Sequence, residues 1–188
     1  RRYITAYTPH GGSFNYKPGS RQHWMFMRVE QFLTLRTDIF LFESQYIRDR
    51  YHAFVGETKR LESVIRNGIS ADEFLPLDRV PDPYDLLYLG ELREAKGVDT
   101  LIDALAILRR DHGMRLSLLA VGSGPSESLL HRRVEDAGIG DATTFEPPQP
   151  IRAALAKARI MVIPSKAESL PYVILEAAAA AQPLVSTD

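Results

Sequence analysis

The chain has 188 residues, 45% of them hydrophobic, and its 23 lysine and arginine residues nearly balance 24 aspartate and glutamate residues. A net charge of −1 argues against a nucleic-acid partner, because it provides no bulk electrostatic attraction. The lack of cysteine excludes disulfides, thiolate nucleophiles and cysteine-based metal sites. No apolar run reaches the ~18 residues of a membrane span and no signal peptide opens the chain, so we expect a cytoplasmic location.

The first 70 residues alternate short β-type runs with longer helical stretches. We expect strands at 3–7, 38–43 and 62–66, and helices at 23–36 and 44–54. The four apolar residues from Ile39 to Phe42 are typical of a strand buried on both faces. A proline-containing segment then interrupts the alternation. We interpret residues 1–75 as the C-terminal part of an α/β domain and residues 76–83 as a linker.

The alternation is cleaner in the second half of the chain. It predicts strands at 84–89, 116–121, 143–145, 160–163 and 183–186, and helices at 98–108, 127–137, 151–157 and 171–181. Strands alternating with helices form βαβ units around a parallel sheet, with helices on both faces. Residues 84–188 are therefore predicted to be a doubly wound domain, whose ligands bind at the carboxyl ends of the strands.

Both ends of the chain look cut from inside a fold. It begins without methionine in a strand-like pattern, and it stops where another strand finishes. We expect a fragment of a longer protein.

The loop after the first strand of the second half carries two cations, Arg93 and Lys96, just before a helix. Cationic side chains beside backbone N–H groups are suited to clamp a diphosphate. The alternative is a solvated surface turn in which Gly97 permits a positive φ.

Gly122 and Gly124 follow the second strand of this half. A dinucleotide-binding fingerprint needs a third glycine where Glu127 stands, so a dehydrogenase is disfavoured. Two interpretations remain open, namely close approach of a ligand and a purely structural turn.

Two carboxylates, Glu168 and Glu176, follow the strand at 160–163. Eight helical residues would separate them by roughly 12 Å, which is too far for the paired carboxylates of a glycosidase. They are better interpreted as groups that hold sugar and ribose hydroxyls. Pro171 favours a helix start whose N–H groups offer an anion site. The alternative is a helix-dipole partner at Glu168 and a surface group at Glu176.

Taken in order, these stretches resemble the retaining glycosyltransferases of family 4, which have the two-domain GT-B fold of two Rossmann-like doubly wound domains. The resemblance rests on the segments 10–12, 64–69 with Phe74, 88–98, 121–125 and 164–165, and on the E-x7-E element from Glu168 to Glu176. It covers nearly the whole chain and implies that both domains are incomplete here.

The resemblance implies transfer of a sugar from a nucleotide-diphosphate-sugar donor to a glycan or lipid-linked acceptor, with retention at the anomeric carbon, no metal and no other cofactor. It implies that His10 and Glu168 are the catalytic residues, with His10 facing the donor sugar and Glu168 binding the sugar hydroxyls. The remaining donor-binding residues that it implies are Arg93, Lys96, Gly122, Gly124, Ser169, Leu170, Tyr172 and Glu176. The loop at 146–148 is where contacts to the base are expected.

Three positions depart from the family pattern. Glu91 stands where many relatives have arginine, so the first phosphate cation is Arg93 or is missing. Ala181 replaces a usual glycine, which we interpret as a mild packing change, and Arg66 replaces a frequent proline. Because terminal parts of both domains are absent, we expect negligible turnover by this chain alone.

Two alternatives to this function remain. One is a non-catalytic nucleotide-sugar-binding fragment, and the other is a different GT-B enzyme such as a nucleotide-sugar epimerase. Separately, the stretch from Lys17 to Arg28 mixes cations with Trp24 and other apolar residues, so an interfacial helix at the inner membrane face is one interpretation. The four consecutive apolar residues from Trp24 to Met27 point around the whole helix, which favours burial instead.

Overall fold

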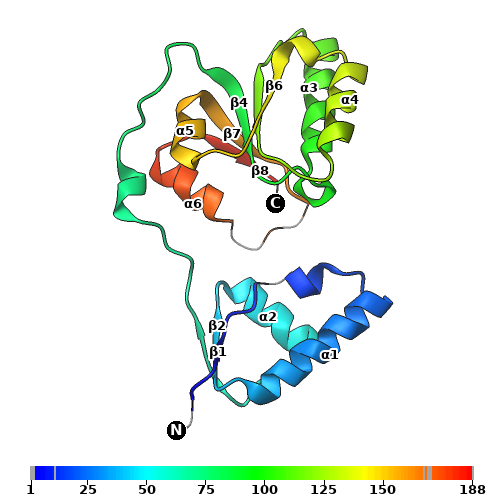
Figure 1. Ribbon diagram of the computed structural model, residues 1–188, viewed down its shortest axis with the longest axis vertical. Helices are drawn as coiled ribbons and strands as arrows, with labels where there is room; N and C mark the ends of the chain where they lie inside the picture. The colour runs from blue at the N-terminus through cyan, green and yellow to red at the C-terminus, as the bar shows by residue number, and fades with distance from the viewer. Residues whose placement is uncertain (1–2, 11, 167, 169–170, 188) are drawn as a thin grey trace. The chain divides into compact units, whose positions relative to one another are not determined.

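The computed structural model describes residues 3–10, 12–166, 168 and 171–187. The chain divides into two compact units, Arg1–Gly68 and Ile69–Asp188. Each unit is built around its own parallel sheet (Figure 1).

The first unit is a three-stranded parallel sheet in the order β1-β2-β3. Its elements are β1 (Ala6–Tyr7), a 3-10 helix (Gly12–Asn15), α1 (Arg21–Arg36), β2 (Ile39–Phe42), α2 (Gln45–Phe54) and β3 (Leu61–Val64). The side chains of Ser20 and Ser44 accept hydrogen bonds from the third backbone N–H of α1 and α2, at 3.1 and 3.2 Å, so a serine caps each helix start.

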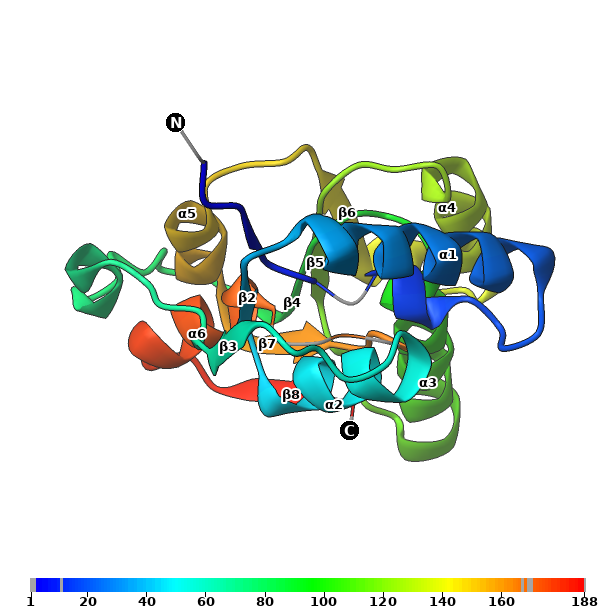
Figure 2. The same ribbon diagram turned by 90° about the horizontal axis from the view of Figure 1, so that it is seen from below.

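Figure 2 shows the two helices of this unit, α1 and α2. Both contribute to one aromatic core, in which Thr34 of α1 bonds Tyr51 of α2 at 2.6 Å. Phe40 and Phe42 point into this core and are fully buried, whereas Ile39 and Leu41 are only partly buried. The expectation of a strand buried on both faces is therefore wrong for the structure described. The reason is that α1 and α2 share a core with the same alternate residues of β2.

Helix α1 buries fewer apolar residues than its sequence suggests. Met27 is buried, but Trp24 and Met25 are 67% and 50% exposed, and Phe32 and Leu35 are exposed as well. Our preference for burial of the run from Trp24 to Met27 is thus corrected. None of the helices in the described part of the chain has the length and apolar character needed to cross a bilayer.

The second unit is a five-stranded parallel sheet in the order β6-β5-β4-β7-β8, as a doubly wound domain requires. Its strands are β4 (Tyr84–Leu89), β5 (Leu118–Val121), β6 (Thr143–Glu146), β7 (Ala158–Ile163) and β8 (Leu184–Ser186). Its helices are α3 (Val98–His112), α4 (Glu127–Asp136), α5 (Ile151–Ala156) and α6 (Tyr172–Ala179). The predicted alternation of strands and helices is confirmed.

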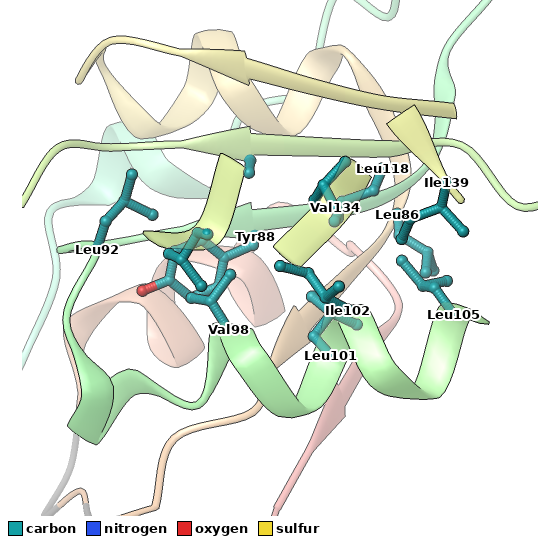
Figure 3. Packing of buried hydrophobic residues seen from close by; sticks show 12 residues of the cluster. Leu86, Tyr88, Leu92, Val98, Leu101, Ile102, Leu105, Leu118, Val134 and Ile139 are labelled. Atoms are coloured by element: carbon teal, nitrogen blue, oxygen red, sulfur yellow. The ribbon is translucent and has the colours of Figure 1, made fainter. Parts of the chain in front are cut away.

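Two separate cores lie on the two faces of this sheet. Helices α3 and α4 cover one face, where Leu86 and Tyr88 of β4 meet Val98 and Ile102 of α3 (Figure 3). Helices α5 and α6 cover the other face, where Leu87 of β4 meets the other core (Figure 1). Alternate residues of the central strand, β4, therefore lie in the two cores. This alternation fixes the register of β4, so that its carboxyl end lies at one edge of the sheet.

The segment expected as a linker is held to the second unit. Arg152 donates to the backbone oxygens of Leu75 and Pro76 at 2.7 and 3.0 Å, and Arg79 donates to the backbone oxygen of Ala158 at 3.0 Å. A short 3-10 helix (Ala71–Phe74) precedes these contacts. The division between the units consequently falls at Gly68, whereas the sequence places it at residue 75.

Candidate functional site

The loops that follow β4 and β7 meet at the carboxyl edge of the five-stranded sheet. Lys96, at the end of a 3-10 turn (Glu94–Lys96), forms an ion pair with Glu168 in the loop after β7. Ser165 also donates to Oε1 of Glu168 at 2.9 Å. The backbone N–H of Lys166 bonds the carbonyl of Ala95 at 2.9 Å, so main chain and side chains together join the two loops.

Three glycines allow the loops at this edge to approach one another. A Cβ on Gly97, whose φ is +66°, would lie 1.9 Å from the carbonyl oxygen of Pro164. A Cβ on Gly122 would lie 1.9 Å from the carbonyl oxygen of Gly90, and one on Gly124 would lie 2.5 Å from that of Leu92. No side chain fits in these spaces, so the three glycines have a structural reason that is independent of any ligand.

A pocket of about 320 Å³ opens beside these loops. The segments that follow β4, β5 and β6 line it, with Gly90, Glu91, Gly122, Ser123, Pro148 and Gln149 among them. Gln149 donates to Glu146 at 2.5 Å, and Lys157 donates to the same carboxylate at 2.6 Å. The pocket thus includes the loop at which sequence reasoning expects contacts to a base, and its size is that of a small ligand site.

Arg93 points to a different partner than Lys96 does. Its Nε lies 3.0 Å from Oε2 of Glu91, and both side chains are about half exposed. The hydroxyl of Tyr88 donates to the backbone oxygen of Glu91 at 2.8 Å. Burial of the ring, together with the charges of Glu168 and Glu91, raises the pKa of Tyr88, so the phenol keeps the proton that it donates. Glu91, the residue that departs from the family pattern, forms the ion pair with Arg93. It thus neutralises one of the two predicted phosphate cations.

Glu176 lies in the second turn of α6, where it is partly buried. Burial raises the pKa of its carboxyl group, and the charge of Glu73 raises it further. The charge of Glu73, a residue that the sequence does not single out, therefore acts on the carboxyl group of Glu176.

Helix α6 ends in a left-handed turn at Ala181, whose φ is +50°. The N–H groups of Ala181 and Gln182 bond the carbonyls of Ala178 and Ala177 at 3.1 and 2.9 Å, which is the Schellman arrangement. Glycine is the usual residue at this position because it has no Cβ. Replacement of the family's glycine by alanine is thus a backbone change, and our interpretation of it as a packing change is corrected.

Ser169 and Leu170, two of the predicted donor contacts, lie outside the described residues. Tyr172 is the first residue of α6, directly after Pro171, and its side chain is half exposed. In the described part of the chain no three His, Asp or Glu side chains are close enough to share a metal ion.

In the first unit, His10 lies at the carboxyl edge of the three-stranded sheet, after β1. Its Nδ1 is 2.8 Å from Oε2 of Glu43, the residue that directly follows β2. The His10 side chain is 68% exposed, whereas that of Glu43 is only 5% exposed. Sequence reasoning missed Glu43, although the rule that chemistry gathers at strand ends applies to it as it does to His10.

The model of the family described as glycosyl transferases group 1 matches residues 72–188, which is more than half of the chain. The chain belongs to this family. Its fold is GT-B, as predicted from the sequence. Membership accounts for a doubly wound second unit with its polar loops gathered at the carboxyl edge.

Two curated relatives and one solved structure illustrate the similarity. A glycogen synthase of Mycobacterium tuberculosis is 34% identical over 85% of this chain and 40% of its own length. A GDP-mannose-dependent alpha-(1-6)-phosphatidylinositol monomannoside mannosyltransferase of the same species is 30% identical over 80% of this chain and 44% of its own. Anabaena HepE, solved with UDP and glucose, superposes with a TM-score of 0.80 at 19% identity, covering 97% of this chain and 52% of that one. The chain spans about half, or less, of the length of these proteins.

Proposed function

We propose that the protein is a family 4 glycosyltransferase that moves a sugar from a nucleotide-diphosphate-sugar donor to its acceptor with retention of anomeric configuration and without a metal ion. The observation that carries this proposal is the joining of Lys96 and Glu168 at the carboxyl edge of β4 and β7. A pocket of about 320 Å³ is lined by other residues of the segments that follow β4, β5 and β6. A cation and a carboxylate placed together suit a molecule that has both a diphosphate and sugar hydroxyls.

Lys96 and Glu168 would contact different parts of the donor. The ammonium group of Lys96 would balance the charge that develops on the diphosphate leaving group. The carboxylate of Glu168 can only accept hydrogen bonds, so it would hold the hydroxyls of the sugar, and Glu176 would hold the ribose. In this scheme donor binding replaces the internal Lys96–Glu168 pair with two contacts to the donor, and Arg93 leaves Glu91 to assist Lys96.

The acceptor is proposed to be a glycan or a lipid-linked molecule. The relatives include a glycogen synthase and an enzyme named for phosphatidylinositol monomannoside, which exemplify the two classes. Helix α1 exposes Trp24, Phe32 and Leu35, and these side chains suit contact with a membrane surface when the acceptor is lipid-linked. Co-sedimentation with anionic vesicles that is lost in Trp24→Ala would favour the lipid-linked acceptor, and no sedimentation would favour the glycan.

A transfer assay tests the reaction itself. A longer protein that contains this chain is supplied with UDP-, GDP- and ADP-sugars and with glycan and lipid-linked acceptors, and the product's anomeric configuration is read by NMR. We expect retention, and unchanged rates in EDTA. An inverted product, or a rate that EDTA abolishes and a divalent ion restores, would contradict the proposal. Because the chain spans about half of its relatives, we propose that it binds the donor alone but turns over negligibly; equal turnover by this chain and a longer protein containing it would contradict that part.

A further inference from the structure

His10 and Glu43 meet because of the topology of the first sheet. Strands β1 and β2 run parallel, with Tyr7 opposite Phe40, so the residues after each strand emerge at the same edge. Three residues after Tyr7, His10 reaches Glu43, which comes directly after Phe42. The resulting contact joins Nδ1 of the imidazole to Oε2 of the carboxylate at 2.8 Å.

The two side chains differ sharply in their access to solvent. Glu43 is 5% exposed and His10 is 68% exposed, so the carboxylate is fixed inside the unit while the imidazole projects outward. A carboxylate accepts hydrogen bonds and does not donate them, so the bridging proton belongs to Nδ1 of His10. In a neutral ring the other nitrogen, Nε2, then carries a lone pair.

We propose that Glu43 is a positioning residue that fixes His10 in the Nδ1–H tautomer, so that Nε2 accepts a hydrogen bond from a substrate hydroxyl group at this edge of the first sheet. The part of this proposal that concerns the substrate rests on the proposed function, whereas the tautomer does not. A buried carboxylate that orients an imidazole sets which nitrogen faces the ligand, and a free histidine in water prefers the opposite, Nε2–H tautomer.

The tautomer can be read directly by NMR. Long-range ¹H–¹⁵N spectra of the whole 188-residue chain, recorded at about pH 8.5 where an ordinary histidine is neutral, distinguish protonated from unprotonated ring nitrogens. His10→Gln assigns the signals of His10 among the five histidines. His52, whose Nε2 lies 3.0 Å from Glu62, provides an internal reference in the same spectrum. We expect His10 in the Nδ1–H form, and an Nε2–H form in the parent chain would overturn the proposal without any variant being made.

Glu43→Gln then tests the cause. The amide removes the charge and can donate to an unprotonated Nδ1, so the Nε2–H population of His10 should rise while His52 is unchanged. Glu30→Gln is the matched control, because Glu30 is also a buried carboxylate of this unit but bonds Tyr7 and Ser13. A His10 spectrum that is the same in Glu43→Gln as in the parent, or that changes equally in Glu30→Gln, would overturn the assignment.

Kinetics of the longer protein separate this inference from the proposed function. Glu43→Gln should lower kcat by about 10-fold with a smaller change in the KM for the donor, as loss of a positioning carboxylate does elsewhere. If the tautomer responds to Glu43 but kcat does not, the substrate contact is overturned and the tautomer stands. If no nucleotide sugar is turned over by the parent protein, the proposed function fails and the NMR result is unaffected.

Discussion

Lys96 and Glu168 are 72 positions apart in sequence and form an ion pair where the loops after β4 and β7 meet. The same two strands carry a second ion pair at their opposite ends, where Arg159 Nη1 lies 2.7 Å from Oδ1 of Asp85. The two pairs are alike in chemistry, but only the first lies at the ligand-binding edge of a doubly wound sheet. The Arg159–Asp85 pair can therefore serve as a control for the effect of charge away from the ligand-binding edge.

Removal of the Lys96 cation should weaken donor binding. In Lys96→Met the diphosphate loses a charge-assisted partner worth about 1.5–3 kcal/mol, so the Kd of a nucleotide sugar should rise by about 10-fold or more. Isothermal titration calorimetry measures the change, and the slope of log Kd against salt concentration should decrease in the variant.

Arg159→Gln is the control for this variant, because it breaks the ion pair at the amino edge of the same strands. Its Kd for the donor should stay within about twofold of the parent, since Arg159 is 58% exposed and surface pairs contribute little. Equal weakening by both variants would mean that Lys96 acts through the overall charge and not at a site.

Gly122 should tolerate no side chain, whatever the ligand. A Cβ placed 1.9 Å from the carbonyl oxygen of Gly90 must push the two loops apart, so Gly122→Ala should lower the free energy of unfolding of the second unit by about 2 kcal/mol. Urea unfolding should be followed by far-UV circular dichroism, because the single tryptophan of the chain, Trp24, lies in the first unit.

Gly113→Ala controls for backbone strain in that experiment. Gly113 also has a positive φ, +65°, but open space surrounds the Cβ position, so the cost should be only about 1 kcal/mol. The close approach of Gly122 to Gly90 would be contradicted by equal losses in the two variants.

Glu176→Gln should stabilise the chain at neutral pH. Burial and the charge of Glu73 raise the pKa of Glu176, so the folded state binds its proton more tightly than the unfolded state does. Its favourable contribution is present below the ordinary pKa of 4.5 and is lost as the pH rises through the folded value. Chemical denaturation should therefore show a more stable variant at about pH 7, with the advantage shrinking toward about pH 4. Because Glu176 is proposed to hold the ribose, the same variant should bind the donor more weakly.

Glu62→Gln should show the opposite pH dependence. Burial acts to raise the pKa of Glu62, but hydrogen bonds from Arg48 at 2.6 Å and His52 at 3.0 Å outweigh it and lower the pKa. The stability that the Glu62 carboxylate contributes is present above its ordinary pKa and is lost on acidification. The variant should therefore be less stable at about pH 7, with the loss shrinking as the pH falls. Two variants with the same pH profile would contradict the assignment of the two shifts.

Ala181→Gly should stabilise the second unit by about 1 kcal/mol. Ala181 has a φ of +50°, a conformation that costs an L-residue energy and costs glycine little. Ala178→Gly, at an exposed position inside α6, should instead destabilise the unit by up to about 1 kcal/mol. Thermal unfolding measures both, and a loss of stability in Ala181→Gly would show that the methyl group contributes packing that outweighs the strain.

The fold could be predicted almost entirely from the sequence, because apolar periodicity and turn residues agree along the second half. Leu86 and Leu87 face opposite cores, and this alternation is what a strand covered on both sides requires. The prediction failed where burial depends on neighbours rather than on pattern. Ile39 and Leu41 look as buried as Phe40 and Phe42, yet only the phenylalanines face α1 and α2.

The candidate site was predictable in its location but not in its pairings. The rule of strand ends identifies Lys96 and Glu168 as candidates and the family resemblance adds His10, but no periodicity tells which charged residue meets which. Glu43 and Glu73 were missed because each is a single carboxylate without a motif, and their roles depend on contacts with His10 and Glu176. The role of Ala181 was misinterpreted because a left-handed φ is a property of the backbone, and an alanine in the sequence does not indicate it.

The most direct test of the central claim compares two ligands on one variant, Glu168→Gln. Calorimetry with a nucleoside diphosphate and with the matching nucleotide sugar, over the UDP, GDP and ADP series, separates the diphosphate contact from the sugar contact. We predict that the variant binds the diphosphate as well as the parent or better, because Lys96 is freed from its internal partner, but loses the added affinity that the sugar provides. The account is contradicted if no member of the series binds the parent, or if the variant retains the full difference between nucleotide sugar and nucleoside diphosphate.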